Sequence, residues 1–456
     1  MERNVIRAEL KKDWTKGSIL GNLWSLSWPT MITQSVTTLG PTIDMIWVGK
    51  LGSAAIAGVG ISGMIVQVVS AVRSGLQTGT RAIVARSIGA SSESDANNVA
   101  NQSFVISIAF AIIAAALGIL WSRQMLLLLG LKANVVDEGA AYLRIQLVGM
   151  VTMSFQMLSQ SLMQAAGDAK TPMTISIVTK IFHVALSPFI IFGWWIFPRM
   201  GVSGAALANV ISQGAAGVWG MWMLYSGRTR LRLTMRNFRF DWKVLWRVTK
   251  IGIPASLNMT ERASANLLVT WFVVPFGTVA VAAQSLMDRV DTLIRMPAMG
   301  IGNAAGVLAG QNLGAGQPER AEKTGWLAVG MFSSIMFILS IAMWFWPEYI
   351  IRVFNTEPGL LEIAAAFLRI QIVGFMMLAF IITLMNCLNG VGDTWVPMLN
   401  TLLTMWLVQM PLAYWLPKNT PLGVYGVRWG MVAAMVVRAT VFGVYFKMGR
   451  WKRKEI

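Results

Sequence analysis

Long apolar runs follow one another along the chain, and glycine, proline or charged residues bound each of them. Most runs reach about 20 residues, the length at which an α-helix crosses the hydrocarbon core of a bilayer. Runs of this length are too long for the strands of a membrane barrel. Lipid offers no hydrogen-bond partner to backbone N–H and C=O groups, so each run has to satisfy its own backbone as an α-helix. We therefore predict an all-α polytopic membrane protein with twelve transmembrane helices, at residues 19–48, 54–80, 97–121, 140–165, 172–197, 203–226, 248–275, 279–309, 322–347, 363–389, 395–416 and 423–447.

The second six spans repeat the first six. Residues 142–149 read YLRIQLVG and residues 367–374 read FLRIQIVG, which sets an offset of 225 residues. The same offset relates Pro29 to Pro254 and Gly89 to Gly314. Matches held in one register over most of the chain indicate a duplication, beyond the chance likeness of apolar helices.

An even number of spans in each copy returns the chain to its starting side of the membrane. The two six-helix pseudo-repeats are therefore parallel, and we expect them to enclose a central cleft. We predict an N-lobe at residues 1–226, a basic cytoplasmic linker at 227–250, and a C-lobe with a basic tail at 251–456. This layout suits alternating access, and no filter-like segment favours a channel.

Composition and charge support a membrane protein. Of 456 residues, 55% are hydrophobic and 13% are charged, which is too apolar for a soluble chain of this length. The net charge of +18 gathers between the spans, so it does not indicate nucleic-acid binding. By the positive-inside rule the linker and both termini lie in the cytoplasm. We expect a monomer in the cytoplasmic (inner) membrane, in contact with its lipids.

The residues that enzymes use are scarce. The chain has one histidine and one cysteine, Cys387, which leaves no metal cluster, no internal disulfide and no usual general base. We therefore predict no enzymatic activity and no cofactor other than a coupling ion. The basic stretch before the first span is not followed by a small-residue cleavage pattern, so we interpret that span as a retained helix.

Several motifs resemble the multidrug and toxic compound extrusion (MATE) family. They are Asp44, the Gly-Lys-Leu-Gly run at 49–52, the glycine-rich stretch 310–316 and the Gly-Val-Gly-Asp-Thr run at 390–394. The resemblance covers nearly the whole chain and is nearest to the DinF-like branch. It implies a secondary active antiporter that exports amphipathic, often cationic drugs in exchange for H⁺ or Na⁺ by alternating access of two lobes.

Asp44 is the polar residue around which the first span is organised. A carboxylate at the centre of a membrane helix costs about 2.5–3.5 kcal/mol on insertion scales, so it needs a cavity or a partner. Thr33, Thr37 and Asp44 fall on one helical face, and Pro41 loosens the helix just before the carboxylate. The resemblance implies cation coupling at Asp44. A structural salt bridge with a basic residue of another span is the alternative.

The fifth span departs from the family pattern. The DinF-like branch that the chain resembles has amides and acids in this span. At the matching positions this chain has Lys180, His183 and Ser187, which lie on one helical face. If that face meets Asp44, the carboxylate pairs with a cation instead of sharing a proton with a second carboxylate. In the alternative, Lys180 snorkels toward the cytoplasm and His183 is only hydrogen-bonded. Because His183 is the only histidine, a pH-sensing role is a third interpretation.

The second lobe carries a glutamate in its first span. Glu261 resembles the seventh-helix glutamate of the Na⁺-coupled NorM-like branch, although it sits one residue early, and Asn258 shares its face. The tenth-helix aspartate of that branch is missing, because Leu378 stands at the aligned position. This absence weakens the case for Na⁺.

The eighth span adds a polar stripe that lipid does not tolerate. Spacings of four, three and four place its members on one helical face: Gln284, Asp288, Asp291 and Arg295. With Glu261 they form a second candidate coupling site for H⁺, or for Na⁺ held by oxygens of Glu261 and Asp291. The alternative is a closed salt-bridge network between helices, joined by Arg73 and Arg262. Soft side chains near the stripe are candidates for the substrate cleft: Met287, Met296 and Met299.

We thus predict a drug antiporter for small amphipathic cations. A lipid-linked oligosaccharide flippase of the same superfamily is the alternative within transport. Such flippases typically carry extra spans and a strongly cationic cavity, so the twelve spans argue against that alternative. Lys180, Arg73 and Arg295 keep it open.

Overall fold

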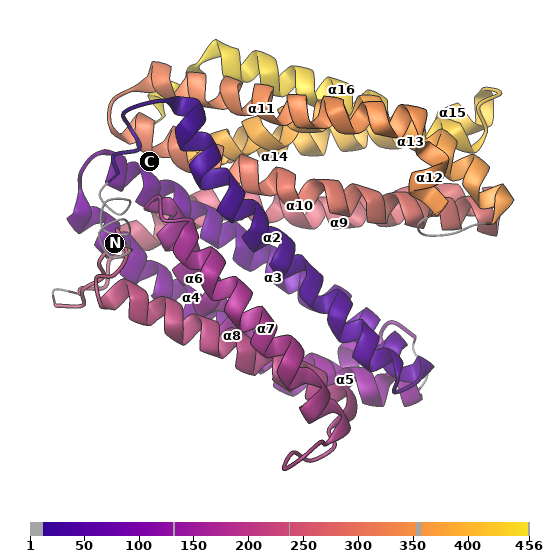
Figure 1. Cartoon of the computed structure of the whole chain (residues 1–456), viewed down its shortest axis with the longest axis horizontal. Coiled ribbons are helices and arrows are strands. Elements are labelled where there is room, and N and C mark those ends of the chain that lie inside the picture. The colour runs from indigo at the N-terminus through magenta and orange to yellow at the C-terminus, as the bar shows by residue number, and fades with distance from the viewer. Residues whose placement is uncertain (1–11, 131–132, 237, 353–356, 455–456) are drawn as a thin grey trace. The chain divides into compact units, whose positions relative to one another are not determined.

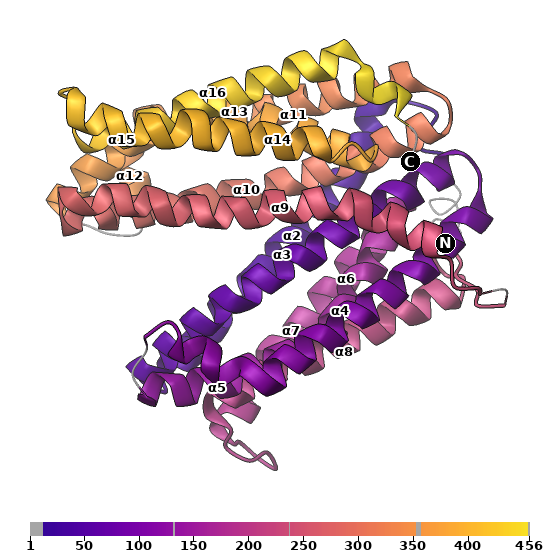
Figure 2. The same cartoon turned by 180° about the vertical axis from the view of Figure 1, so that it is seen from behind.

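The computed structural model describes residues 12–130, 133–236, 238–352 and 357–454, without the side chains of residues 39–41, 134, 262–264, 266 and 267. Within these ranges the chain is helical and contains no strand (Figures 1 and 2). Its elements are α2 (Ile19–Gly49), α3 (Ser53–Gly89), α4 (Glu93–Leu127), α5 (Ala133–Val148), α6 (Met150–Ala165), α7 (Lys170–Phe192), α8 (Gly201–Tyr225), α9 (Trp242–Val273), the 3-10 turn η1 (Val274–Phe276), α10 (Thr278–Gly314), α11 (Pro318–Phe345), α12 (Pro347–Arg352), α13 (Pro358–Gly390), α14 (Trp395–Thr404), the π-helix η2 (Met405–Gln409), α15 (Met410–Asn419), α16 (Val424–Met448) and the 3-10 turn η3 (Arg450–Arg453).

The predicted twelve spans are present in the described part of the chain. Two of them are interrupted, since α5 and α6 meet at Gly149 and the eleventh span passes from α14 through η2 into α15. Within the described residues, seven helices have both the length and the hydropathy needed to cross a membrane. The chain is a multi-pass membrane protein.

The chain divides into two compact units. One contains residues 1–14 and 32–256, and the other contains residues 15–31 and 257–456. The helices α2 and α9 therefore contribute to both units. The structure places residues 242–250, which the sequence assigns to the linker, in the first turns of α9. Lysine and arginine are good helix formers, so a basic segment read as a loop is compatible with helix.

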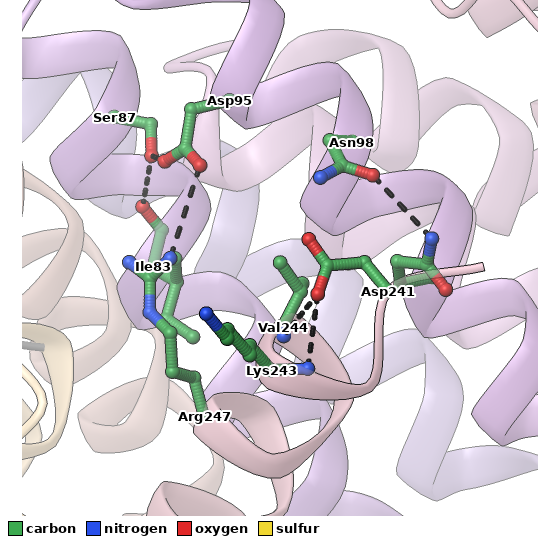
Figure 3. Close-up of polar contacts among 9 residues, drawn as sticks. Ile83, Ser87, Asp95, Asn98, Asp241, Lys243, Val244 and Arg247 are labelled. Atoms are coloured by element: carbon green, nitrogen blue, oxygen red, sulfur yellow. Dashed lines mark hydrogen bonds and ion pairs between the residues drawn. The ribbon is translucent and has the colours of Figure 1, made fainter. Parts of the chain in front are cut away.

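Asp241 marks the start of α9. Its Oδ1 accepts hydrogen bonds from the backbone N–H groups of Lys243 (2.9 Å) and Val244 (3.3 Å), as Figure 3 shows. A side-chain acceptor at this position satisfies donors that have no partner inside the helix. The first turn of α9 is thereby fixed to the end of the linker.

Within the first unit, α3 packs against α5 and the amino end of α9 approaches α3 very closely. A Cβ added at Gly75 would meet the hydroxyl of Ser256, and one at Gly79 would meet the carbonyl of Val248. The Ser256 hydroxyl donates to the carbonyl of Val72 at 2.8 Å. Glycine is required at Gly75 and Gly79 because the two backbones leave no room for a side chain.

Within the second unit, α13 lies at the centre and packs against α10, α11 and α16. Its closest contact is with α10, where a Cβ at Gly390 would meet the backbone of Gly306. Small residues allow membrane helices to approach in this way, and close packing then supplies most of the attraction.

The duplication extends to individual contacts in the turn after the second helix of each unit. In the first unit the Ser87 hydroxyl donates to Oδ2 of Asp95 at 2.5 Å (Figure 3). In the second unit Nε of Arg320 donates to Oδ1 of Asn312 at 3.1 Å. Both positions of the pair are related by the offset of 225 residues found in the sequence.

The segment after the sixth helix of the first unit docks on α4. The side-chain amides of Asn97 and Asn101 donate to the carbonyl of Thr234 at 3.1 and 2.9 Å, and Gln102 donates to the carbonyl of Arg239 at 2.5 Å. The segment also buries apolar side chains, including that of Leu233, which is 1% exposed. Hydrogen bonds from neutral side chains and apolar burial hold this basic linker, together with an ion pair between Arg247 and Asp95 at 3.9 Å.

The equivalent segment of the second unit is the carboxyl-terminal tail, and it is held by charge. Lys452 contacts Glu319 at 2.9 Å and Glu322 at 2.6 Å, while Lys454 contacts Asp393 at 2.5 Å. The two glutamates raise the pKa of Lys452 and so keep it charged. Trp451, which is buried, stacks on Phe446 with ring centroids 4.8 Å apart.

Candidate functional site

The first unit buries Asp44 beside the only histidine. Oδ1 of Asp44 on α2 lies 3.2 Å from Nε2 of His183 on α7, and their side chains are 5% and 1% exposed. The fifth-span face thus meets Asp44, which is the condition under which the sequence predicts that the carboxylate pairs with a cation. A carboxylate and an imidazole at this distance can share a proton, and burial leaves water a small part in that exchange.

Further polar groups face this pair from the same unit. Tyr142 on α5 interacts electrostatically with Asp44, and its hydroxyl accepts a hydrogen bond from Gln146 at 3.0 Å. Lys180, one turn before His183, also interacts electrostatically with Asp44. Asp44 is therefore surrounded by two basic side chains and a phenol, with no second carboxylate in this set.

Two predicted companions of Asp44, Ser187 and Thr37, direct their hydroxyl groups to carbonyls of their own helices. The Ser187 hydroxyl is fully buried but donates to the carbonyl of His183 at 2.8 Å, within its own helix. Thr37 is exposed, and its hydroxyl donates to the carbonyl of Thr33 at 2.7 Å. Thr33 itself is buried. Hydroxyls in helices often return to a carbonyl one turn back, which spacing alone does not reveal. The side chain of Pro41 lies outside the described residues.

Lys180 also borders an apolar hollow on the first unit. The hollow has a volume of about 430 Å³, and α2 and α7 supply its walls, among them Val36, Ile43 and Ile177. Lysine can place its long methylene stem against hydrophobic surface. Lys180 therefore borders this apolar hollow as well as interacting with Asp44.

The second unit contains an internal cavity of about 180 Å³. The carboxylates Asp288 and Asp291 on α10 line it, together with the guanidinium groups of Arg295 and Arg438. The α10 stripe predicted from the sequence therefore faces a cavity. Gln284 lies one turn before Asp288 in that stripe. Its buried side-chain amide donates a hydrogen bond to Oδ1 of Asp288 at 3.1 Å.

Arg428 on α16 is a further basic residue that interacts with these carboxylates. It is fully buried, interacts electrostatically with Asp288 and Asp291, and donates to Oε1 of Gln371 at 3.5 Å. Its guanidinium carbon lies 5.1 Å from the centroid of the Phe367 ring. A buried arginine of this kind balances the two acids without entering the cavity lining.

Further polar lining residues come from α9, α14 and α16. Nε of Arg438 donates to the hydroxyl of Thr404 at 2.8 Å, and Asn258 donates to the hydroxyl of Thr401 at 3.0 Å. Glu261 is buried and interacts electrostatically with Arg438. Glu261 therefore belongs to the same charged region as the α10 stripe, although it does not line the cavity.

The soft side chains of this cavity differ from those expected. Met287 is fully buried, and none of Met287, Met296 and Met299 lines the cavity. Methionines from other helices line it instead: Met385, Met405, Met431 and Met435. Met405 begins η2, and π-helical turns are frequent at functional sites.

No group of three or more His, Cys, Asp or Glu side chains converges as a metal site in the described ranges. Na⁺ at Glu261 and Asp291 therefore stays a prediction. Arg73, expected in a salt-bridge network, instead donates to the carbonyl of Met153 at 3.2 Å. The side chain of Arg262 lies outside the described residues.

Four polar residues of these sites were missed by the sequence reasoning. Arg428 and Arg438 could have been found, because two arginines inside the apolar run of the last span call for buried partners. Tyr142 and Gln146 gave no such signal. Their closeness to Asp44 depends on which face α5 turns toward α2 and α7, and one sequence does not fix this contact.

Comparison with known proteins gives a consistent result. The model of the family described as MatE matches residues 29–189 and 254–415. The chain is 27% identical over 438 residues to the "Probable multidrug resistance protein NorM" of Thermotoga maritima, covering 95% of this chain and 93% of that protein. It is 26% identical over 432 residues to the "Probable multidrug resistance protein YoeA" of Bacillus subtilis, covering 94% and 93%.

A solved structure shares the fold. The "Crystal structure of MATE in the bent conformation" superposes with a TM-score of 0.89 at 24% identity, covering 95% of this chain and 96% of that one. At this identity the likeness concerns the fold alone. The twelve-helix layout in two halves is common to both chains.

Proposed function

Because the chain belongs to the MatE family, whose members are transporters and not enzymes, we propose that it is a drug efflux transporter of the membrane. Family membership confirms the prediction that the chain is not an enzyme. The finer proposal is a secondary active antiporter that exports amphipathic or cationic drugs in exchange for an ion. The proposal also includes alternating access of two six-helix lobes.

The observation that carries the coupling mechanism is the buried pair of Asp44 and His183, 3.2 Å apart. A drug cation and a proton compete for the same carboxylate, so occupation by one weakens binding of the other. Exchange requires only that the two forms of the transporter differ in affinity for the ion and the drug. Lys180 and His183 are poor neighbours for Na⁺, which prefers oxygen ligands, so we favour H⁺ in this unit.

The test is export of a fluorescent cationic dye from proteoliposomes under an imposed pH gradient or an imposed Na⁺ gradient. Asp44→Asn and Glu261→Gln are assayed beside the unaltered protein. We expect export driven by the pH gradient that falls by about tenfold or more in Asp44→Asn, because typical coupling factors are about 5- to 150-fold. Glu261→Gln should keep most of it.

Other outcomes assign the coupling differently. Na⁺-driven export that is lost in Glu261→Gln would move the site to the second unit and contradict the proton mechanism at Asp44. No dye movement under either gradient would contradict the multidrug proposal. That result would favour the flippase alternative, which the basic residues Lys180 and Arg73 of the first unit still support.

We further propose that the protein works as a monomer in the cytoplasmic (inner) membrane with both termini in the cytoplasm. The support is the basic character of the linker and the tail. Arginines of the linker have exposed side chains that can meet anionic lipid headgroups: Arg232, Arg236 and Arg239. Protease added to sealed vesicles of known orientation would test the placement of the tail.

A further inference from the structure

The loop between α7 and α8 presents large apolar side chains to its surroundings. It spans residues 193–200, and the exposed fractions are 51% for Trp194, 87% for Trp195 and 78% for Ile196. Figures 1 and 2 show the loop as an extension beyond the ends of both helices. Exposed apolar side chains that are gathered in one place mark a surface that contacts lipid or another molecule.

The two most exposed residues lie at the tip of a tight turn. The N–H of Phe197 donates to the carbonyl of Trp194 at 3.3 Å, so Trp195 and Ile196 are the central residues of that turn. Trp195 has a φ of 63°, in the left-handed region that glycine, asparagine and aspartate normally occupy in turns. A bulky residue in this conformation is strained, and strain of this kind is retained where the side chain has a use.

Contacts with α7 fix the base of the loop. Gly193 has a φ of 72°, and a Cβ at this position would meet the backbone of Arg199, so the two ends of the loop touch. The Trp194 ring packs against two aromatic rings of α7, with Phe189 edge-on at a centroid distance of 5.7 Å and Phe192 stacked at 5.9 Å. With its base held in this way, the loop turns its tip away from the helices.

The duplication shows that the fold does not require an apolar tip. The offset of 225 residues pairs this loop with the connection between α15 and α16 in the second unit. There Asn419 and Thr420 occupy the positions of Trp194 and Trp195. Polar residues therefore serve at the same turn of the repeated fold, and the tryptophans of the first unit need another explanation.

The position of the loop favours phospholipid as its partner. The helix α8 crosses from this loop to the basic linker, so the loop lies at the opposite membrane surface. Exposed apolar residues continue from the loop along both helices, for example Ile181 on α7 and Val218 on α8, which are 65% and 72% exposed. Tryptophan collects at the boundary between acyl chains and head groups. The exposed guanidinium of Arg199, at the base of the loop, matches a phosphate.

We propose that residues 193–200 form a lipid anchor of the first unit. Trp195 and Ile196 insert near the ester groups of the lipids in the leaflet opposite to the linker, and Arg199 binds a phospholipid phosphate. The anchor holds the end of α7, the helix that carries His183, at a fixed depth in the bilayer. The inference does not depend on what the protein transports or on which ion drives transport.

A fluorescent label at the tip measures its depth in the bilayer. In the full-length protein, Cys387→Ala removes the only cysteine, and Ile196→Cys then carries an NBD label. The purified protein is placed in phosphatidylcholine nanodiscs in which some lipids carry a nitroxide near the ester end of an acyl chain. Asn419→Cys with the same label is the matched control, because Asn419 is exposed in the equivalent loop. We expect the nitroxide to quench the label at position 196 several times more strongly, and iodide in the buffer to quench the label at position 419 more strongly.

Substitutions in the labelled protein assign the insertion to named side chains. Trp195→Asn removes the indole, and asparagine tolerates the positive φ, so nitroxide quenching should fall toward that of the control. Arg199→Glu places a carboxylate beside the lipid phosphates and should have the same effect, whereas Arg199→Lys should keep the quenching of the parent. Thermal unfolding of each variant in detergent shows that it is folded.

Three results would overturn the inference. The first is a label at position 196 that iodide quenches as strongly as the label at position 419, which would place the tip in water and favour a protein partner. The second is equal nitroxide quenching of the two labels, and the third is quenching that survives both Trp195→Asn and Arg199→Glu. Dye export is not part of this measurement, so a failure of the proposed transport leaves the result for the anchor unaffected.

Discussion

The contact between Asp44 and His183 puts one carboxylate and one imidazole in a place where both are almost completely buried. A proton on the imidazole makes the contact an ion pair, whereas a proton on the carboxylate leaves both groups neutral. Lys180 and Tyr142 also interact electrostatically with Asp44. Under the proposed proton coupling, uptake would therefore depend on this small cluster and not on Asp44 alone.

Replacing His183 by glutamine tests this view at the scale of one residue. Glutamine can still donate to Asp44 but cannot take up a proton. We expect proton-driven dye export to fall by about tenfold. Initial export rates from proteoliposomes under a fixed pH gradient measure the change.

Ser212→Ala is the matched control for His183→Gln. The Ser212 hydroxyl is also buried in the first unit, but it only returns to the carbonyl of Ala208 at 2.8 Å. This variant should keep the export rate of the unaltered protein. An unchanged rate in His183→Gln would contradict a role for the imidazole in proton uptake.

At this scale the buried acids and the polar face of the fifth span could be identified from the sequence, and their part in coupling stays a prediction. The sequence could not show that the hydroxyl groups of Ser187 and Thr37 donate hydrogen bonds within their own helices, because this depends on side-chain rotamers. It also missed Arg428, although the position of an arginine inside an apolar span was visible. Which methionines reach the cavity depended on contacts across helices, and there the prediction from Met287, Met296 and Met299 did not match the lining.

Among the helices, the contact of α10 with α13 is the tightest approach in the second unit. Gly390→Ala places a Cβ against the backbone of Gly306, which has no flexible end to move aside. Overpacking of this kind costs about 1–3 kcal/mol, so we expect a lower midpoint of thermal unfolding in detergent.

Gly443→Ala on α16 provides the comparison for that substitution. Nothing lies within 4 Å of a Cβ at this position, so alanine should leave the midpoint unchanged or raise it slightly through its better helix propensity. If Gly390→Ala unfolded at the same temperature as Gly443→Ala, the close contact of α10 with α13 would be relaxed in solution.

Helix positions were largely predictable, whereas helix interruptions were not. The eleventh span was expected to be continuous, but it contains η2 just before Pro411. Proline lacks a backbone N–H, so the preceding turn has to rearrange its hydrogen bonds. That local change brings Met405 and Gln409 to the cavity, and hydropathy carries no information about it.

For the molecule as a whole, the duplication seen in the sequence is also a duplication of contacts. The turn pairs Ser87 with Asp95 and Asn312 with Arg320 occupy equivalent places in the two units. The segment that follows the sixth helix docks in both units, through amides on α4 in one and through lysines in the other. The repeat could be predicted, but these different chemistries could not, because their partners are distant in sequence.

The docked tail can be tested by protease. Replacing Lys452 and Lys454 by alanine removes the contacts to Glu319, Glu322 and Asp393. We expect chymotrypsin to cut after Trp451 several times faster, because that side chain is otherwise 1% exposed. Arg453→Ala is the control, since Arg453 is exposed. Equal cleavage rates would mean that the stacking of Trp451 on Phe446 suffices to hold the tail.

The different chemistry of the two docked segments has a consequence for ionic strength. Dissolved salt screens exposed charges over about 8 Å at physiological concentration and about 3 Å at 1 M, whereas hydrogen bonds between neutral groups are nearly indifferent to it. Three lysine–carboxylate contacts hold the tail, whereas hydrogen bonds from side-chain amides and one longer Arg247–Asp95 ion pair (3.9 Å) hold the linker. A rise in ionic strength should therefore weaken the attachment of the tail in the second unit more than that of the linker in the first.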